Sequence, residues 1–362
     1  MAKIRVGIIG AGWGQLQLES FKRARDYQVV ALCDTDAARL NEIATKYKID
    51  QTYADYHELI ARNDIDLISI AAPPDCHQAM ALATIDAHKH LLVEKPLALN
   101  ANDARVLLQS AEAKEIVHAI DFEMRYLPAL AYSKELIDEK YLGQLLRVDV
   151  TMGMLRPWGE HGNWAAEDSR GGGILMELGS HFIDTLLWWF GDACAVFAGR
   201  RTHFSTVKIP TVDPKSRETI LVKKPVTGDD AFWCVLQFAN GGEALLNFVT
   251  GARHDPGWTI SAYGSAGTLI VNSGQLLGMR DGDREMAILP IPKRLELGDN
   301  PKDPLMWSMA KLADAMASKI NRERDAKPFP NFGDGVAVSQ IIDAIRRASD
   351  ERGWVDVKIG VG

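Results

Sequence analysis

The sequence predicts an α/β protein with two domains: an N-terminal doubly wound parallel sheet, and then an α+β domain built on a mostly antiparallel open sheet. Three observations lead to this fold class. The chain has 362 residues, which is long enough for about two domains with separate cores. Short apolar runs alternate with helical spacing over the first 122 residues. After that point, strand-like runs follow one another closely.

The N-terminal part alternates strands and helices. Its apolar runs are rich in β-branched residues, which is typical of buried parallel strands. These runs are residues 4–9, 29–34, 65–71, 90–94 and 115–121. Helical spacing occurs at residues 14–25, 36–48, 55–62, 77–88 and 101–113. The alternation predicts a parallel sheet covered by helices, and we assign this domain to residues 1–122.

The second domain is assigned to residues 123–362. It is expected to begin with a helix over 128–141 and a strand over 145–154. Runs such as FWCVLQFA and EALLNFVTGA are joined by tight turns, NGG among them, and predict antiparallel neighbours. The tail predicts helices over 303–320 and 335–351, the second capped by Asp334. The closing WVDVKI could add an edge strand.

Composition argues against several classes of function. The net charge of -7 and the pI near 5.8 argue against a nucleic-acid surface. No apolar run approaches the roughly 20 residues of a membrane helix, and the N-terminus has no signal-peptide pattern, so we expect a cytoplasmic protein. The cysteines lack metal-ligand spacing, so no metal site is predicted and the thiols are expected to be buried and reduced. They are Cys33, Cys76, Cys194 and Cys234.

A glycine-rich turn follows the first strand. The turn, GAGWGQ, carries Gly10, Gly12, Trp13 and Gly14 directly before a helix. This strand, turn and helix are the context of the Rossmann dinucleotide-binding fingerprint. The third glycine of that fingerprint falls where this chain has Gln15, so the match is incomplete.

An acid ends the second predicted strand. Asp34 comes about 20 residues after the turn, where a carboxylate grips the adenosine ribose hydroxyls. With the turn, it predicts dinucleotide binding rather than a purely structural tight turn. Asp34 and Asp36 would repel a ribose 2′-phosphate, so NAD is expected rather than NADP. Arg39 is the residue that could upset this preference.

Two further loops are expected at the same edge of the sheet. In AAPPDCH, Pro73 cannot continue the third strand, and His77 either touches the cofactor or begins the next helix. The fourth strand ends in Glu94, Lys95 and Pro96. A lysine in this place points into the cofactor crevice. A surface lysine is the alternative, and the glycine-rich turn favours a placed catalytic lysine.

Polar groups interrupt an apolar helix within residues 170–191. Glu177, His181 and Asp184 are expected on one face, after three glycines that leave the first helical amides open to an anion or a hydroxyl. Burying ionisable groups costs several kcal/mol unless they are paired or used. The pattern predicts a substrate pocket, although a core histidine bonded to a carboxylate would show the same pattern.

Two segments near this helix have alternative interpretations. Trp158 and Trp164 could stack on a sugar ring or anchor a long loop. Residues 200–228 are polar and extended, and could form a lid or a subunit contact.

With these residues in place, the chain resembles the family of glucose-fructose oxidoreductase, inositol dehydrogenase and rhizopine-catabolism oxidoreductases, often called Gfo/Idh/MocA. The resemblance runs nearly from end to end. It is carried by GIIGAGWG, Asp34, the proline-rich turn, EKPLA at 94–98, FEMRYLPA at 122–129, GGGILMELGSHFID, YGSAGTL at 263–269 and PFPNFGDG.

The resemblance implies a Rossmann domain and a C-terminal domain whose open sheet often makes dimers or tetramers. It implies hydride transfer between nicotinamide and a hydroxyl or carbonyl carbon of a sugar, polyol or cyclitol. The lysine of the EKP motif falls on Lys95, and the histidine of the GxHxxD motif falls on His181. Cofactor contacts are expected at Gly10, Gly12, Trp13, Gly14, Asp34, Pro73, His77, Glu94 and Lys95.

The expected roles follow from alcohol chemistry. A histidine, with a reference pKa of about 6.5, suits the base that takes the hydroxyl proton, so this role goes to His181. Lys95 would hold the developing negative charge on oxygen. The two roles could be exchanged if the lysine is buried.

Two positions depart from the family pattern. Glu177 stands where members usually carry aspartate, and Asp121 stands where many carry asparagine or another residue near the nicotinamide. Glu177 is still expected to orient His181 or to bind a substrate hydroxyl. A second hypothesis is a cofactor-binding regulator that has lost catalysis, and a third is redox-assisted glycoside cleavage through a transient keto sugar.

Overall fold

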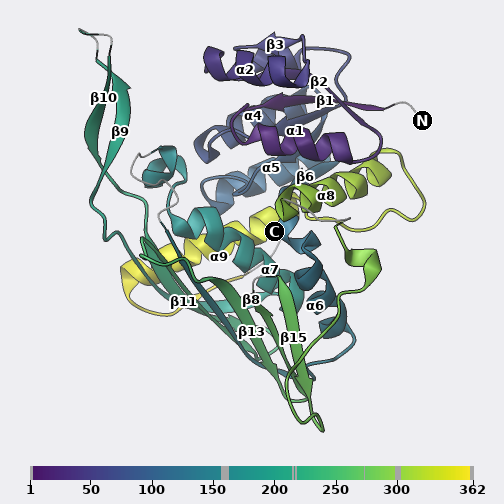
Figure 1. Ribbon diagram of the computed structural model, residues 1–362, viewed down its shortest axis with the longest axis vertical. Coiled ribbons are helices and arrows are strands. Elements are labelled where there is room, and N and C mark those ends of the chain that lie inside the picture. Colours follow the sequence, from purple (N-terminus) through teal and green to yellow (C-terminus); the bar gives the residue numbers. More distant parts are fainter. Residues whose placement is uncertain are drawn as a thin grey trace. The chain divides into compact units, whose positions relative to one another are not determined.

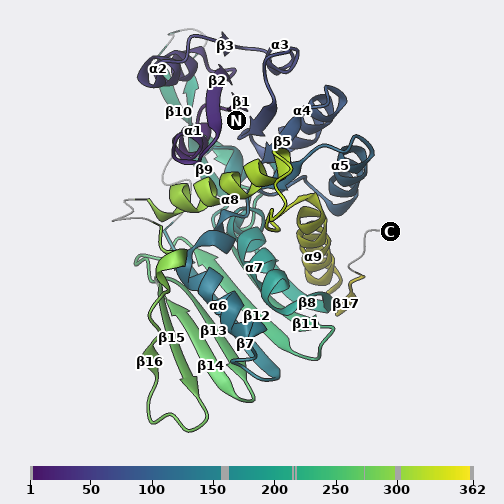
Figure 2. The same ribbon diagram turned by 90° about the vertical axis from the view of Figure 1, so that its right-hand side faces the viewer.

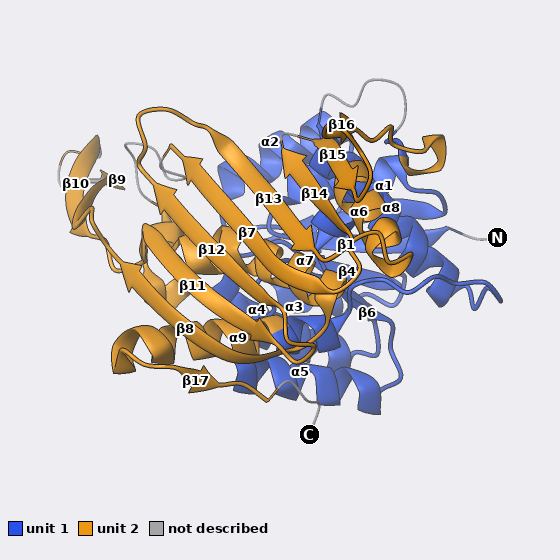
Figure 3. Cartoon of the chain, turned by 90° about the horizontal axis from the view of Figure 1, so that it is seen from below, with its two compact units in different colours: residues 1–127, 296–337, 361 blue, residues 128–295, 338–360, 362 orange. Residues whose placement is uncertain are grey.

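The computed structural model describes residues 3–155, 163–213, 216, 218–272, 274–297 and 303–358. The chain divides into two compact units, coloured separately in Figure 3. Unit 1 comprises residues 1–127, 296–337 and 361, and unit 2 comprises residues 128–295, 338–360 and 362. Each unit contains one of the two large sheets.

Unit 1 contains, within its described residues, a six-stranded sheet of order β3-β2-β1-β4-β5-β6. All of its pairings are parallel, and the predicted doubly wound parallel sheet is confirmed. The strands are β1 (Ile4–Ile9), β2 (Tyr27–Cys33), β3 (Thr52–Tyr53), β4 (Leu67–Ile70), β5 (His90–Val93) and β6 (His118–Ile120). Strand order reverses next to β1, and ligands bind in such sheets beyond the carboxyl ends of the strands at that point.

Helices follow the strands of unit 1 as the spacing predicts (Figures 1 and 2). They are α1 (Gly14–Arg23), α2 (Ala37–Tyr47), α3 (Tyr56–Ile60), α4 (Pro74–Asp86) and α5 (Ala101–Ala113). Asp36 caps α2, where its side chain accepts hydrogen bonds from the amides of Ala38 and Arg39. Asn100 caps α5 through the amide of Asp103. These caps stabilise the starts of helices that pack on the sheet.

A helix from the far end of the chain completes unit 1. Helix α8 (Pro304–Ile320) lies beside α1 (Figure 1). The Ser20 hydroxyl donates to the Met306 carbonyl at 2.9 Å, and the Tyr27 hydroxyl donates to the Ala313 carbonyl at 2.7 Å. An apolar core spans this contact, and it includes Leu18, Phe21, Met309, Leu312 and Met316.

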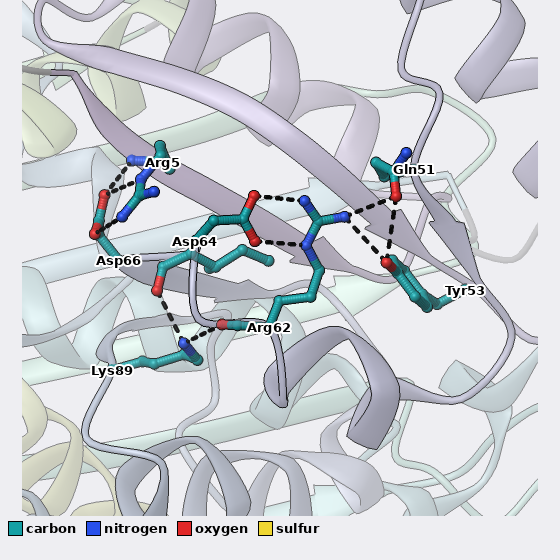
Figure 4. A network of polar contacts seen from close by, with 8 residues as sticks. Arg5, Gln51, Tyr53, Arg62, Asp64, Asp66 and Lys89 are labelled. Atoms are coloured by element: carbon teal, nitrogen blue, oxygen red, sulfur yellow. Dashed lines mark hydrogen bonds and ion pairs between the residues drawn. The ribbon is translucent and has the colours of Figure 1, made fainter.

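The other edge of the unit 1 sheet, where the strands begin, is held by a polar network (Figure 4). Asp66 accepts two side-chain bonds from Arg5, at 2.8 and 3.0 Å. Arg62 pairs with Asp64 at 2.6 Å. The Lys89 ammonium donates to two backbone carbonyls, those of Arg62 at 2.7 Å and Ile65 at 2.9 Å. The two edges of the sheet are therefore built differently, and the carboxyl edge carries the candidate cofactor residues.

Unit 2 contains, within its described residues, a nine-stranded sheet of order β16-β15-β14-β13-β7-β12-β11-β8-β17 (Figure 3). Only the β12–β7 pairing is parallel among those described, so the predicted mostly antiparallel sheet is confirmed. The strands are β7 (Leu145–Met154), β8 (Ala193–Arg201), β11 (Ala231–Phe238), β12 (Glu243–Thr250), β13 (Gly257–Gly264), β14 (Gly267–Asn272), β15 (Gln275–Arg280), β16 (Ala287–Ile288) and β17 (Val355–Asp356).

Helices cover one face of this sheet, and a separate hairpin extends from it (Figures 1 and 2). The helices are α6 (Pro128–Asp138), α7 (Ser180–Phe190) and the unit 2 part of α9 (Phe332–Glu351). The hairpin pairs β9 (Thr206–Val212) with β10 (Thr219–Pro225). The predicted edge strand near the C-terminus is β17, which pairs with β8 and is confirmed.

Two predictions about local structure are wrong. Helix α9 begins at Phe332, and Asn331 caps it by accepting from the Gly333 amide at 2.7 Å, so Asp334 is not the cap. Asp334 lies in the first turn and accepts from the Asn331 amide at 2.8 Å, which completes a reciprocal capping arrangement. Cys194 is exposed rather than buried, because it lies on the solvent side of a strand, and Cys76 is half-buried; only Cys33 and Cys234 are buried as expected. Among the described helices, none is long and apolar enough to cross a membrane.

Candidate active site

Five strands of unit 1 end in register, so the residues that follow them line one edge. Ile9 pairs with both Cys33 and Ile70, Ile70 pairs with Val93, and Val93 pairs with Ile120. The next residue on each strand is Gly10, Asp34, Ala71, Glu94 and Asp121. Adjacent strands lie about 4.8 Å apart, so this register brings residues far apart in sequence to one edge.

Position 10, on this edge of the sheet, admits only glycine. Its φ is +98°, and a Cβ atom there would lie 2.5 Å from the Ala71 carbonyl oxygen. A side chain is therefore excluded by both conformation and contact. Gly14 allows α1 to pack closely on β1, because a Cβ there would lie 3.0 Å from the Ile8 side chain. Gly14 thus provides the close helix–strand packing that the fingerprint assigns to its third glycine.

Asp34 is joined to the glycine-rich turn. One carboxylate oxygen accepts the Ala11 amide at 2.7 Å and the other accepts the Asp36 amide at 2.8 Å. Each oxygen of a carboxylate can accept a second bond. The oxygen that accepts the Ala11 amide also pairs with the Arg39 guanidinium at 3.5 Å. The side chain is only 8% exposed, so these contacts set its direction, and the oxygen that accepts the Asp36 amide keeps room for a ribose hydroxyl.

The residues at this turn fit a dinucleotide. Among the residues that the structure describes, no side chain caps the start of α1 at Trp13, and no acid lies in its first turn. Amides at such a helix start attract a diphosphate. The backbone at Gly12 is not crowded by other atoms. The nearest atom to a Cβ built there would be a guanidinium nitrogen of Arg39, at 3.5 Å. Arg39 pairs with Asp36 at 2.9 Å, so its charge is already partly balanced.

The proline-rich turn is braced by a buried histidine. Pro73 precedes α4, and His77 lies within its first turns. The two ring nitrogens of His77 contact the carbonyl oxygens of Ala72 and Pro96, each at 2.8 Å. Burial lowers the pKa of this imidazole. His77 therefore links the loop after β4 to the loop after β5, and its predicted contact with the cofactor stays a prediction.

Lys95 and Glu94 follow β5 at the same edge. The Lys95–Pro96 peptide bond is cis. Glu94 is buried, and its carboxyl accepts a hydrogen bond from the Gln17 amide nitrogen at 2.9 Å. The Gln17 carbonyl oxygen in turn accepts from the Ser69 hydroxyl at 2.7 Å. This chain fixes Glu94 inside unit 1, directly before the lysine.

The histidine-bearing helix lies in unit 2, and its first turn is not α-helical. Leu175–Gly179 form a π-helical turn that leads into α7. Such turns often occur at functional sites. Glu177 lies in the π turn and is partly exposed, whereas His181 is 5% and Asp184 is 1% exposed. The sequence spacing assumed a continuous α-helix, so the π turn changes the face on which Glu177 lies relative to α7.

Asp229 supports the start of this helix. Its carboxylate accepts the Leu175 amide at 3.0 Å, and its carbonyl accepts the Ile174 amide at 2.8 Å. A Cβ on Gly173 would lie 2.5 Å from a carboxylate oxygen of Asp229, so this position must be glycine. Burial raises the pKa of Asp229 to about 6.

Sequence reasoning missed Gln17 and Asp229. Gln17 lies on the buried face of α1 between apolar neighbours. A polar residue in such an apolar stripe is a sequence signal for a buried hydrogen bond. Asp229 carries no comparable signal. Trp158 lies outside the described residues, and Trp164 packs against a small apolar cluster that includes Ala165 and Val207.

The sheet order, the glycine-rich turn and the placed acid define a dinucleotide-binding protein of the Rossmann class. Residues 4–122 match the profile described as oxidoreductase family, NAD-binding Rossmann fold, and residues 130–270 match the GFO/IDH/MocA C-terminal domain. The chain belongs to the Gfo/Idh/MocA family of oxidoreductases, and its N-terminal domain binds NAD.

Several known proteins are similar over nearly the whole chain. An uncharacterized oxidoreductase of Synechocystis sp. is 30% identical over 98% of this chain and 96% of its own length. Levoglucosan dehydrogenase of Pseudarthrobacter phenanthrenivorans is 25% identical over 99% of both chains. A structure of levoglucosan dehydrogenase with NADH and levoglucosan has a TM-score of 0.85 at 23% identity, covering 99% of this chain and 100% of the other. That structural likeness shows the shared fold.

Proposed function

We propose that the protein is an NAD-dependent dehydrogenase of a sugar, polyol or cyclitol. The observation that carries this proposal is the position of Lys95, which follows β5 at the sheet edge formed by Gly10 and Asp34. The similarity to levoglucosan dehydrogenase supports a carbohydrate substrate. The acids at Asp34 and Asp36 favour NAD over NADP, because both would repel a 2′-phosphate.

The proposed roles divide the chemistry between a histidine and a lysine. Bound nicotinamide would accept or supply the hydride at its C4 atom. His181 takes the hydroxyl proton during oxidation, and Lys95 donates to the same oxygen and stabilises its negative charge. Glu177 orients His181 or binds a substrate hydroxyl. The cofactor contacts are proposed at Gly10, Gly12, Trp13, Gly14, Asp34, Pro73, His77, Glu94 and Lys95.

The experiment is nicotinamide absorbance during incubation with NAD or NADP and a panel of aldoses, anhydrosugars, inositols and sugar acids. We expect turnover with wild type and NAD, and a loss of at least about 100-fold in His181→Ala, because general acid–base catalysis contributes this much. The control is NADH titration, which should give equal affinity in both proteins. Turnover that survives in His181→Ala would contradict the role of the histidine.

A cofactor-binding regulator is the second candidate. It is favoured by Glu177, one methylene longer than the usual aspartate, and by Gln15 in place of the third fingerprint glycine. This candidate predicts NADH binding without turnover of any member of the panel. It also predicts that Lys95→Ala keeps full biological activity.

We also propose that the open sheet of unit 2 forms the contact of a homodimer or homotetramer. On the face opposite the helices, β11, β12 and β13 each carry one exposed large apolar side chain among polar and smaller ones. Trp233 is 41%, Val249 is 43% and Tyr263 is 38% exposed. Exposed apolar surface of this kind marks an association site. Light scattering should give an oligomer for wild type and a smaller species for Trp233→Asp.

A further inference from the structure

Two acids on neighbouring strands of unit 1 are in side-chain contact. Glu94 directly follows β5 and Asp121 directly follows β6, and the two strands are in register at Val93 and Ile120. The Asp121 amide continues this ladder by donating to the Val93 carbonyl at 2.9 Å. The two carboxyl groups lie close enough to act on each other's protonation.

This contact requires a proton. Glu94 is 6% exposed and Asp121 is 2% exposed, so water does not separate their charges. Two ionised carboxylates are acceptors only and cannot form a hydrogen bond with each other. Among the described residues, none donates to Asp121 Oδ1, which is buried. A proton shared between the two carboxyls leaves one negative charge on the pair.

The surrounding groups indicate where the proton lies. The Gln17 amide, itself oriented by Ser69, donates to Glu94 Oε1, which favours the ionised form of Glu94. Burial raises the pKa of both carboxyls. The pKa of Asp121 is raised further by the charges of Glu94 and Glu123, whereas Lys95 opposes the shift in both acids. Asp121 is therefore the member that holds the proton.

We propose that Glu94 and Asp121 act as one proton-sharing pair whose single negative charge positions the ammonium group of Lys95. Lys95 directly follows Glu94 in the chain, and its positive charge opposes the rise in the pKa of both acids. The proposal rests on the dehydrogenase function in one respect, because Lys95 is the group that meets the substrate oxygen. Glu94 and Asp121 are positioning residues: they act through the lysine.

The shared proton is tested on the protein without cofactor. Infrared spectroscopy at pH 8 should show the carbonyl band of a protonated carboxylic acid in wild type, and Asp229 is ionised at that pH. Glu94→Gln and Asp121→Asn each leave one carboxylate with an amide donor, so each should abolish the band. Asp66→Asn, at the opposite edge of the sheet, should retain it. A band that persists in both single variants, or is missing from wild type, overturns the shared proton.

The positioning role is tested by changing the number of negative charges beside Lys95. Each single variant keeps one negative charge beside Lys95, as wild type does, whereas the double variant Glu94→Gln/Asp121→Asn keeps none. The rate of Lys95 labelling by a small amine-reactive reagent at one fixed pH should therefore be alike in wild type and the single variants. In the double variant the rate should rise by at least about threefold, because no negative charge of the pair then holds the ammonium group in place. An unchanged rate in the double variant overturns the role.

Turnover gives a third and separate readout. The kcat of the double variant should be at least about tenfold below that of either single variant, because coupled residues are not additive. Equal losses in single and double variants would indicate a packing role and overturn the proposal. If no substrate of the panel is turned over, the dehydrogenase proposal fails while the infrared and labelling results still decide the state of the pair.

Discussion

The Asp34 carboxylate accepts the backbone amide of Ala11 at 2.7 Å, so the acid after β2 is fixed to the turn after β1. The bond joins the two parts of the site that meet a dinucleotide: the turn for the diphosphate and the acid for the ribose. Loss of the carboxylate should therefore affect the cofactor in two ways, through the missing ribose contact and through a looser turn.

Asp34→Ala should weaken NADH binding by about 10- to 100-fold, since hydrogen bonds to a charged group contribute about 1.5–3 kcal/mol. NADPH binding should change less, because the repulsion of its 2′-phosphate is relieved at the same time. Fluorescence titration of both cofactors measures the difference. Asp36→Asn, an exposed neighbour, is the control and should change NADH affinity little. Equal losses for NADH and NADPH in Asp34→Ala would contradict the ribose contact.

Gly10→Ala should lower the free energy of unfolding by about 2 kcal/mol or more, because its Cβ would meet the Ala71 carbonyl at 2.5 Å in a left-handed backbone conformation. Urea denaturation measures the loss. Gly282→Ala has a comparable φ of +92° but nothing within 4 Å of its Cβ, so it reports the backbone effect alone. A similar loss in the two variants would show that the close approach to Ala71 costs nothing.

His77→Phe should destabilise the protein by about 1–3 kcal/mol, because the buried carbonyl oxygen that accepts the single ring N–H of the neutral imidazole loses its hydrogen bond. The matched control is His57→Phe on the exposed surface. The pKa of His77 is lowered by burial, so the unfolded chain binds more protons below about pH 6.5 and stability is lost as the pH falls.

Burial also lowers the pKa of His90, and it lowers the pKa of His118 to about 4. His77→Phe should therefore remove only part of the acid sensitivity. Denaturation at pH 5 and pH 8 tests this prediction. An unchanged slope of stability with pH would contradict it.

Asp229→Asn should stabilise the protein at neutral pH. Burial raises the pKa of this carboxyl from 3.8 to about 6, so the folded state binds more protons than the unfolded state and stability falls as the pH rises through this range. The neutral amide can still accept from Leu175. The gain should approach about 3 kcal/mol at pH 7.5 and should be small at pH 4. An equal change at both pH values would contradict the pKa shift.

Much of the fold could be predicted because periodic apolar patterns determine strands and helices. The limits of β1, β7 and α5 are those expected from the sequence. The second, fourth and fifth predicted strands were one residue too long at their C-terminal ends. They included Asp34, Glu94 and Asp121, the polar residues that begin the site. Strand β3 has two residues, too few for any periodicity to appear.

The site could be predicted only where local chemistry has a sequence signature. The glycine-rich turn and the acid after β2 have one. The Glu94–Asp121 contact depends on the register of two strands, which no local pattern specifies. The π turn at Leu175–Gly179 likewise has no signature, since it differs from an α-helix by a single residue per turn.

The return of α8 to unit 1 has a consequence for folding during synthesis. The apolar faces of α1 and of the residues around Tyr27 leave the ribosome early, but their partners Met309, Leu312 and Met316 are made only after residues 128–295 of unit 2. Until then, the N-terminal sheet carries an uncovered hydrophobic surface, and a nascent chain of this kind is a substrate for chaperones. A chain truncated before residue 304 would keep that surface exposed permanently. Loss of α8 should therefore cause aggregation rather than give a smaller folded protein.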